Sequence, residues 1–221
     1  MQKKLNPVLN DLALTFLASA TALLIGMSLL LYVTDMGRSF TTEGFRRHRI
    51  QIKAEAVVNL ALIDTSGRSL FLRDAIQSDG RYVVLDFFYT SCITICTAQA
   101  FAFDLLQQRI KDANLEKKVR LISISFDPKH DDIDALKIYA KNIGSDELIW
   151  SLMTLQNSTD LKSMLQGFGI YVVKASPLGD LDHNVSLHLI DPNGELIKIS
   201  ALDDVDELFE VLQKTIFDAK I

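Results

Sequence analysis

Hydrophobic residues form one long uncharged run near the start of the chain and shorter, spaced runs after it. From Leu12 to Val33 no residue carries a charge, and a run of this length can cross a bilayer as a helix. The apolar core of a cleaved signal peptide is usually shorter, about 7–15 residues. We therefore expect a short cytoplasmic segment (1–11), an uncleaved transmembrane anchor (12–34) and a polar juxtamembrane linker (35–50).

The remaining pattern alternates between strands and helices. Paired runs at 57–63 and 69–72 predict a hairpin, and nearly continuous apolar runs at 82–89 and 119–126 predict strands buried on both faces. Shorter strands are expected at 150–154, at 170–173 and in a late hairpin at 185–191 and 195–200, which turns at Asn193-Gly194. Helices are expected at 98–110, 131–143 (ended by Gly144), 158–168 (capped by Ser158) and 203–219.

This order of elements indicates the fold class. Strands that alternate with helices favour a mostly parallel sheet with helices on its faces, and the late hairpin adds antiparallel strands. We predict an α/β domain over residues 51–221 with a thioredoxin-like fold, in which helices flank a central mixed sheet.

Charge narrows the possible partners. The net charge is -5, and no run of Lys and Arg is interleaved with aromatic residues, so we do not expect a nucleic acid partner. The basic cluster at 46–49 lies close to the expected anchor, where contact with lipid headgroups is its simplest explanation. Basic residues lie on both sides of the anchor, which leaves its orientation open on charge alone.

The only two cysteines, Cys92 and Cys96, lie between a buried strand and a helix. Amide groups at a helix N-terminus stabilise a thiolate and lower the pKa of the thiol. A thiolate is both the nucleophile of disulfide exchange and a soft ligand that selects Cu(I). If the helix begins near Cys92, the i,i+4 spacing places both sulfurs on one face, where they share a metal or form a disulfide. Two inert buried cysteines are the alternative.

Two acids and the histidines complete the candidate site. Asp86 lies on the buried strand six residues before Cys92, where a raised pKa would suit a proton acceptor; a carboxylate that only makes local hydrogen bonds is the alternative. Asp127 ends the neighbouring strand. His188 is five residues after His183, an odd offset that turns its side chain away in an extended strand. We expect His130 and His48 to be solvent-exposed or, for His48, in contact with headgroups.

Four motifs give the chain a resemblance to the Sco/SenC family of copper-binding cytochrome c oxidase assembly proteins, from the anchor to the last helix. They are FFYTSCITIC at 87–96, SISFDP at 123–128, LDHN at 181–184 and LIDPNG at 189–194. A CxxxC pair alone is a weak signal, whereas the four motifs in this order are specific.

The resemblance implies that Cys92, Cys96 and His183 bind copper, as Cu(I), Cu(II) or both, with Asp127 beside them. It implies a chaperone without turnover that delivers copper to the dinuclear copper site of a respiratory oxidase. Its partners would be the copper-containing oxidase subunit and an upstream copper donor or thiol reductase. It also implies a single-pass protein of the bacterial inner membrane with its domain in the periplasm.

The chain departs from the family pattern beside both cysteines. The family often has proline after each cysteine, where this chain has Ile93 and Thr97. Thioredoxin-like oxidoreductases usually carry a cis-proline just before the late strand, and residues 183–186 contain no proline. This favours metal binding over simple disulfide exchange. A thiol–disulfide oxidoreductase that reduces the cysteines of the client's copper site is the alternative, with Cys92 and Cys96 as its redox-active pair.

Overall fold

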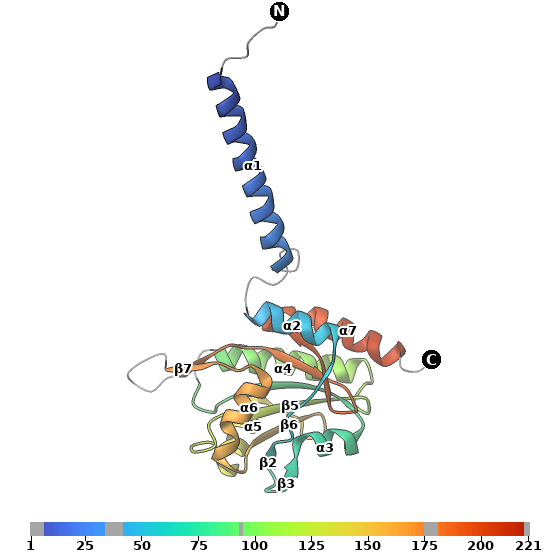
Figure 1. The fold of residues 1–221 in the computed structure, drawn as a ribbon. Helices are drawn as coiled ribbons and strands as arrows, with labels where there is room; N and C mark the ends of the chain where they lie inside the picture. Colours follow the sequence, from blue (N-terminus) through green and yellow to red (C-terminus); the bar gives the residue numbers. More distant parts are fainter. Residues whose placement is uncertain (1–6, 34–41, 93–94, 175–180, 219–221) are drawn as a thin grey trace, which may run out of the picture. The chain divides into compact units, whose positions relative to one another are not determined.

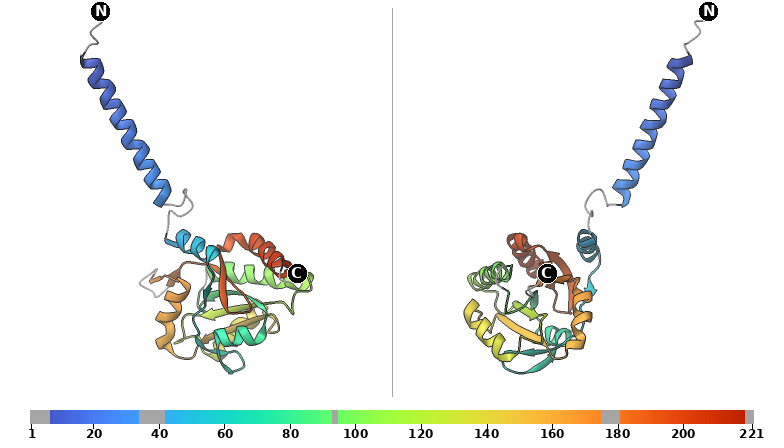
Figure 2. Two further views of the ribbon diagram at one scale, coloured as in Figure 1. Left: turned by 45° about the vertical axis from the view of Figure 1, so that its right-hand side comes forward. Right: turned by 90° about the vertical axis from the view of Figure 1, so that its left-hand side faces the viewer.

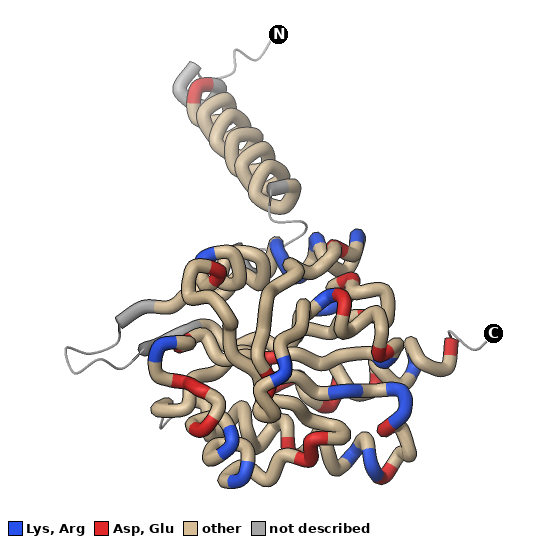
Figure 3. The backbone as a smooth tube through the Cα atoms, turned by 90° about the horizontal axis from the view of Figure 1, so that it is seen from below, with Lys and Arg blue, Asp and Glu red and all other residues tan. Residues whose placement is uncertain are grey.

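A computed structural model describes residues 7–33, 42–92, 95–174 and 181–218. The chain divides into two units, residues 1–48 and 49–221. In the first unit, helix α1 (Pro7–Val33) contains one candidate membrane span, Asp11–Tyr32, with a mean hydropathy of 2.1. Its one charged residue is Asp11, near its start (Figure 3). The length and composition of α1 therefore meet the requirements of a span.

Helix α2 (Thr42–Ile52) occupies most of the polar stretch that the sequence analysis treated as a linker. Its last turn belongs to the second unit, where Ile50 is buried in the hydrophobic core. From Thr42 onward, the polar stretch is therefore helical up to the start of the domain.

The second unit contains an eight-stranded mixed sheet with the order β1-β10-β9-β4-β5-β6-β2-β3 (Figure 1). Strands β4, β5 and β6 are parallel, and every other neighbouring pair is antiparallel. Its strands are β1 (Glu55–Ala56), β2 (Ala61–Asp64), β3 (Ser69–Phe71), β4 (Tyr82–Phe88), β5 (Val119–Ser125), β6 (Trp150–Leu155), β9 (Leu187–Ile190) and β10 (Glu195–Ser200). A separate antiparallel pair joins β7 (Val172–Lys174) to β8 (Leu181–His183). The predicted thioredoxin-like mixed sheet is thus confirmed.

Five helices cover the two faces of this sheet. They are α3 (Leu72–Asp79), α4 (Ile95–Asp112), α5 (Ile133–Ile143), α6 (Leu161–Phe168) and α7 (Val205–Asp218), with short 3-10 helices at Ser158–Asp160 and Leu202–Asp204. Because crossovers between adjacent parallel strands are right-handed, the β4-α4-β5 and β5-α5-β6 units place α4 and α5 on one face. Figure 2 shows α4, α5 and α7 on this face, and α3 and α6 on the opposite one.

Strand β4 contributes alternate side chains to the two layers of the core. The Phe87 ring packs against Phe168 of α6, with 4.9 Å between ring centroids. The next residue, Phe88, stacks on Tyr139 of α5, also at 4.9 Å. Since Asp86 shares the parity of Phe88, its carboxyl group is directed toward the layer that contains α4 and α5.

Several element boundaries differ from those expected from the sequence. Helix α3 was not predicted, and α4 begins at Ile95 rather than at residue 98. Helix α5 begins at Ile133, because Asp132 supplies the cap by accepting a hydrogen bond from the Ala135 amide at 2.9 Å. Ser158 is not a cap; the residue before its 3-10 helix is Asn157, whose side chain makes no capping bond. The expected stop at Gly144 is confirmed, with a left-handed φ of 70°.

Candidate metal centre

The two cysteines lie where the chain passes from β4 into α4. Cys92 precedes the first helical residue, and Cys96 lies in the first turn of α4. The Cys96 amide donates a hydrogen bond to the Cys92 sulfur at 3.3 Å, and the Cys92 amide donates to the Tyr89 carbonyl oxygen at 3.3 Å. Both are free thiols. The condition that both cysteines lie on one helix is therefore not met; a turn before the helix brings the Cys92 sulfur to its N-terminus.

The two thiols differ in solvent exposure and therefore in reactivity. Cys92 is partly exposed, whereas Cys96 has 1% of its surface exposed. Burial raises the pKa of the Cys96 thiol well above its usual range, and the neighbouring Cys92 sulfur adds to this increase. The expected lowering by the helix N-terminus is therefore wrong for Cys96. Loss of its proton requires a metal ion or a nearby proton acceptor.

Asp86 lies in β4 close to this buried thiol. It is 3% exposed, and its nearest donor is the Gln99 side-chain amide, at 3.4 Å from Oδ2. Within the described part of the chain, Oδ1 accepts no hydrogen bond. Burial raises the pKa of Asp86 to about 7, and the hydroxyl of Ser123 offsets only part of the increase. The negative charge of Asp86 also contributes to raising the pKa of Cys96. A raised pKa beside a buried thiol is what a proton acceptor needs, and that role of Asp86 stays a prediction.

Asp127 follows the end of β5 and holds an exposed histidine. His130 Nδ1 lies 2.8 Å from Asp127 Oδ2, and the His130 side chain is 77% exposed. Both residues line an open cleft of about 750 Å³ whose opposite wall includes Leu165 of α6 and Val172 of β7. His130 is therefore solvent-exposed, as expected from the sequence.

His183 lies in strand β8, a strand that the sequence analysis did not predict. Its backbone pairs with Val172 of β7, while its side chain and that of Asp182 lie outside the described structure. The next residue, Asn184, has a described side chain that bonds to the segment between α6 and β7: Oδ1 accepts from the Tyr171 amide at 2.7 Å, and Nδ2 donates to the Gly169 carbonyl at 3.0 Å. The β7–β8 pair is thus tied to the end of α6.

The strand register shows which end of the sheet lies nearest to the β7–β8 pair, called the arm below. His188 of β9 lies opposite Leu85 of β4, and the two strands are antiparallel. Residues that precede His188 therefore run toward the carboxyl end of β4, the end from which the chain continues to Cys92. The backbone of His183 accordingly lies at the same end of the sheet as the cysteine pair.

His188 itself belongs to the hydrophobic core. It is fully buried, its Nε2 donates to the Phe168 carbonyl at 3.2 Å, and its ring makes edge contacts with Phe87 and Phe168. This agrees with the expectation that it does not act with His183. Among the side chains described, which exclude His183, no three His, Cys, Asp or Glu residues are grouped as a metal site.

Sequence reasoning missed one residue that contacts the cysteine loop. Asp131, expected as the first residue of a helix, is instead 1% exposed and accepts hydrogen bonds from the amide and hydroxyl of Thr90. Two adjacent aspartates before a helix are the only sequence signal, and both are acceptable caps.

The fold and the cysteine pair define a thioredoxin-like α/β protein with a dithiol between a central strand and the following helix. A sequence model of the SCO1/SenC family matches residues 51–216. Because this match covers most of the chain, the protein belongs to the SCO1/SenC family, as its motifs indicated. The SCO1 protein homolog of Bacillus subtilis is 30% identical over 120 residues, which are 54% of this chain and 61% of that protein. The chain thus spans about three fifths of this relative.

Solved structures agree with this assignment. A SCO1/SenC family lipoprotein from Bacillus anthracis has a TM-score of 0.64 and 24% identity, over 73% of this chain and 96% of the other. ScoI of Arabidopsis thaliana, solved with copper bound, has a TM-score of 0.63 and 22% identity, over 74% and 99%. BsSco, described as a Sco family cytochrome c oxidase assembly protein with a disulfide switch, has a TM-score of 0.61 and 26% identity, over 73% and 94%.

Proposed function

We propose that this protein is a membrane-anchored copper chaperone that binds copper through Cys92, Cys96 and His183 and delivers it to the dinuclear copper site of a respiratory oxidase. The observation that carries the proposal is the convergence of a dithiol and a histidine-bearing strand at one end of the sheet. Sco proteins from Arabidopsis thaliana, Bradyrhizobium japonicum and yeast have been solved with copper bound. BsSco belongs to a family of cytochrome c oxidase assembly proteins.

The chemistry of the donor set fits copper. Two thiolates and one imidazole form a soft, three-coordinate set suited to Cu(I), and a further ligand would accommodate Cu(II). Copper passes to the client by stepwise exchange of ligands. The partly exposed Cys92 is the sulfur that a client ligand replaces first, and the buried Cys96 is replaced later. Asp86 accepts the Cys96 proton when the thiol becomes a ligand, because its pKa of about 7 makes it a base at neutral pH.

The membrane location forms part of the same proposal. Helix α1 is an uncleaved single span, and residues 51–221 form the copper-binding domain on the periplasmic side of a bacterial inner membrane. The support is the length and hydropathy of the Asp11–Tyr32 span and the family membership of residues 51–216.

Titration of the reduced full chain in detergent micelles with Cu(I) and with Cu(II) tests the proposal. We expect one tightly bound copper per chain, which His183→Ala weakens by at least about 100-fold for Cu(II), since removal of a ligand exceeds the effect of an outer-sphere change. The matched control is His130→Ala, which removes an exposed histidine from the same end of the sheet and should leave both affinities unchanged. Equal affinities of wild type and His183→Ala would refute the ligand assignment.

The geometry also supports a second function, thiol–disulfide exchange with the client. Cys92 would attack the client disulfide, Cys96 would displace it, and the protein would end as the Cys92–Cys96 disulfide while the client gains two thiols. Asp86 accepts the Cys96 proton in the second step, and an upstream reductase restores the dithiol. This function does not need His183. If His183→Ala retains both exchange activity and oxidase assembly in cells, exchange is the function and the chaperone proposal is wrong.

A further inference from the structure

Asp131 is a buried carboxylate without a cationic partner among the residues described. It is 1% exposed, and every side-chain hydrogen bond that it accepts comes from a neutral group. Burial of a charged carboxylate is unfavourable unless hydrogen bonds compensate. Apolar side chains in place of a buried charge often stabilise a protein as well or better. Stability alone therefore gives a weak reason for an aspartate at this position.

The bonds of Asp131 converge on the segment that leads to Cys92. Its Oδ2 accepts from the Thr90 amide at 3.0 Å, and its Oδ1 accepts from the Thr90 hydroxyl at 2.6 Å. Thr90 is two residues after the end of β4 and two residues before Cys92. Both the backbone and the side chain of Thr90 are thus fixed by one carboxylate.

The other contacts of Asp131 anchor it to the neighbouring strand. Its Oδ2 also accepts from the hydroxyl of Ser125, the fully buried last residue of β5. The Asp131 amide donates to the Asp127 carbonyl at 2.9 Å, and the Asp127 amide donates to the Ser125 hydroxyl at 3.0 Å. The carboxylate therefore lies between a rigid strand end and the start of the cysteine loop.

The other described hydrogen bonds of Cys92 are local. The residues after the two cysteines, Ile93 and Thr97, are not prolines, so no ring limits φ there. The described hydrogen bonds that set the position of Cys92 are those of its amide to Tyr89 and of its sulfur to the Cys96 amide. The bonds of Thr90 to Asp131, two residues before Cys92, determine the direction in which the chain leaves β4.

We propose that Asp131 is the positioning residue of the metal centre: its hydrogen bonds to Thr90 hold the segment from Thr90 to Cys92 in the conformation that binds copper. This inference rests on the proposed copper site and adds a residue that contacts neither the metal nor the sulfurs. Asp131→Asn replaces one of the two acceptor oxygens by a donor, so the Thr90 amide and hydroxyl cannot both keep their bonds to this side chain.

The test uses the reduced full chain in detergent micelles and compares Asp131→Asn with Asp132→Asn. The control variant removes the adjacent carboxylate, which is exposed and caps α5 through the Ala135 amide without any bond to the loop. Competition with a chromophoric Cu(I) chelator should show affinity about 10-fold to 100-fold lower in Asp131→Asn, the usual effect of an outer-sphere partner. Asp132→Asn should bind Cu(I) as wild type does and should keep the cap of α5, because asparagine accepts the same hydrogen bond.

A second readout needs no metal. Alkylation of the buried Cys96 requires local opening of the loop, so its rate in the apoprotein should rise at least about five-fold in Asp131→Asn and remain unchanged in Asp132→Asn. If the wild type binds no copper but Cys96 follows this pattern, the copper proposal fails and the positioning role stands. If alkylation and copper affinity are the same in Asp131→Asn and wild type, the positioning role is wrong.

Thr90 gives an independent pair of variants should Asp131→Asn not fold. Thr90→Val keeps the shape of the side chain and its amide but removes the hydroxyl that donates to Asp131 Oδ1, whereas Thr90→Ser retains the hydroxyl. We expect faster Cys96 alkylation and weaker copper binding in Thr90→Val and recovery of both in Thr90→Ser. Equal behaviour of the two variants would overturn the inference.

Discussion

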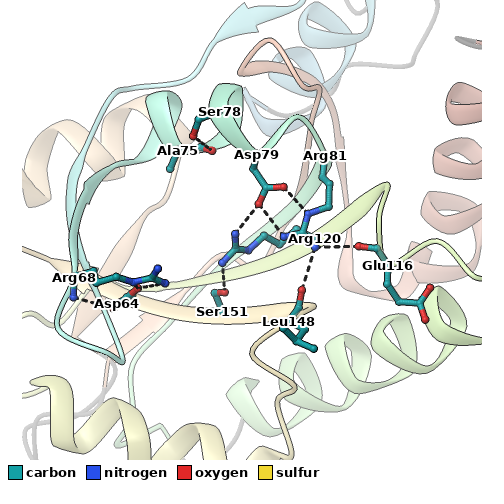
Figure 4. A network of polar contacts seen from close by, with 10 residues as sticks. All are labelled: Asp64, Arg68, Ala75, Ser78, Asp79, Arg81, Glu116, Arg120, Leu148 and Ser151. Atoms are coloured by element: carbon teal, nitrogen blue, oxygen red, sulfur yellow. Dashed lines mark hydrogen bonds and ion pairs between the residues drawn. The ribbon is translucent and has the colours of Figure 1, made fainter.

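The two ends of the parallel strands β4 and β5 hold acidic side chains in opposite ways. At the amino ends, Asp79 is bracketed by Arg81 and Arg120, and Arg120 also donates to Ser151 at the start of β6 (Figure 4). These arginines, Arg81 first, hold the pKa of Asp79 below its usual value. At the carboxyl ends, Asp86 and Asp131 have only neutral donors among the described residues.

This difference separates a stabilising end from a functional end. A paired acid remains charged and contributes to stability above its lowered pKa, and that contribution is lost as pH falls through this value. A buried acid with neutral partners reduces stability once charged, and such groups gather where chemistry requires them. We infer that the arginine network preserves the sheet while the carboxyl end supplies proton acceptance and loop position.

The largest effect is expected for Asp86→Asn. The folded pKa of about 7 lies above the ordinary value of 3.8, so the stability that comes from the protonated acid is present at low pH and lost as pH rises to about 7. This shift corresponds to at most about 4 kcal/mol. Urea unfolding of the reduced, metal-free chain should show Asp86→Asn about 2 kcal/mol more stable than wild type at pH 8 and equal to it at pH 4. The same difference at both pH values would contradict the raised pKa.

The next largest effect is expected for Arg120→Met at the opposite end. This change leaves Asp79 with one cation and Ser151 without its donor, which should lower stability by about 2 kcal/mol, less than for a fully buried pair because these side chains are partly exposed. Copper affinity should not change. Lys137→Met, which breaks a pair with Asp134 that is exposed on both sides, is the control and should cost less than about 1 kcal/mol. A loss of copper binding in Arg120→Met would mean that the two ends are not separate.

Asn184→Ala tests the arm that carries His183. The change removes one acceptor and one donor that join β8 to Gly169 and Tyr171, and we expect a stability loss of about 1–2 kcal/mol. Cu(II) affinity should also fall, because His183 follows the position of this arm. Asn193→Ala removes an amide of the late hairpin turn and should leave the affinity unchanged. Unaltered copper binding in Asn184→Ala would show that the arm needs no anchor there.

The smallest effect is expected for His130→Ala. This exposed side chain pairs with Asp127 at the surface, and such pairs contribute about 0–1 kcal/mol. Chemical denaturation should place the variant within about 0.5 kcal/mol of wild type. A larger loss, or a change in copper stoichiometry, would give Asp127 and His130 a direct part in the site.

The sequence predicted those parts of this comparison that depend on long, uniform patterns. The apolar runs predicted both β4 and β5, and the cysteine spacing together with Asp86 indicated the carboxyl end of these strands as the candidate site. Helix α3 escaped prediction because it is short and its N-cap, Phe71, makes no side-chain capping bond. Strand β7 overlaps the strand expected at 170–173, but its partner β8 was missed because it is only three residues long.

The role of Asp131 could not be read from the sequence for a different reason. Asp131 and Asp132 are adjacent and chemically identical, and either can cap a helix. Only the tertiary structure decides that Asp132 caps α5 from the surface while Asp131 turns inward to Thr90. The Asp79 network was missed similarly, since Asp79, Arg120 and Ser151 come from three separate elements.

X-ray absorption spectroscopy at the copper edge tests the central claim most directly, with the full chain loaded with one Cu(I) in detergent. The account predicts two sulfur donors and one nitrogen donor for wild type, loss of the nitrogen in His183→Ala, and loss of one sulfur in Cys92→Ser. A copper environment without sulfur, or one that neither substitution alters, would contradict the assignment of the carboxyl end of the sheet as the copper site.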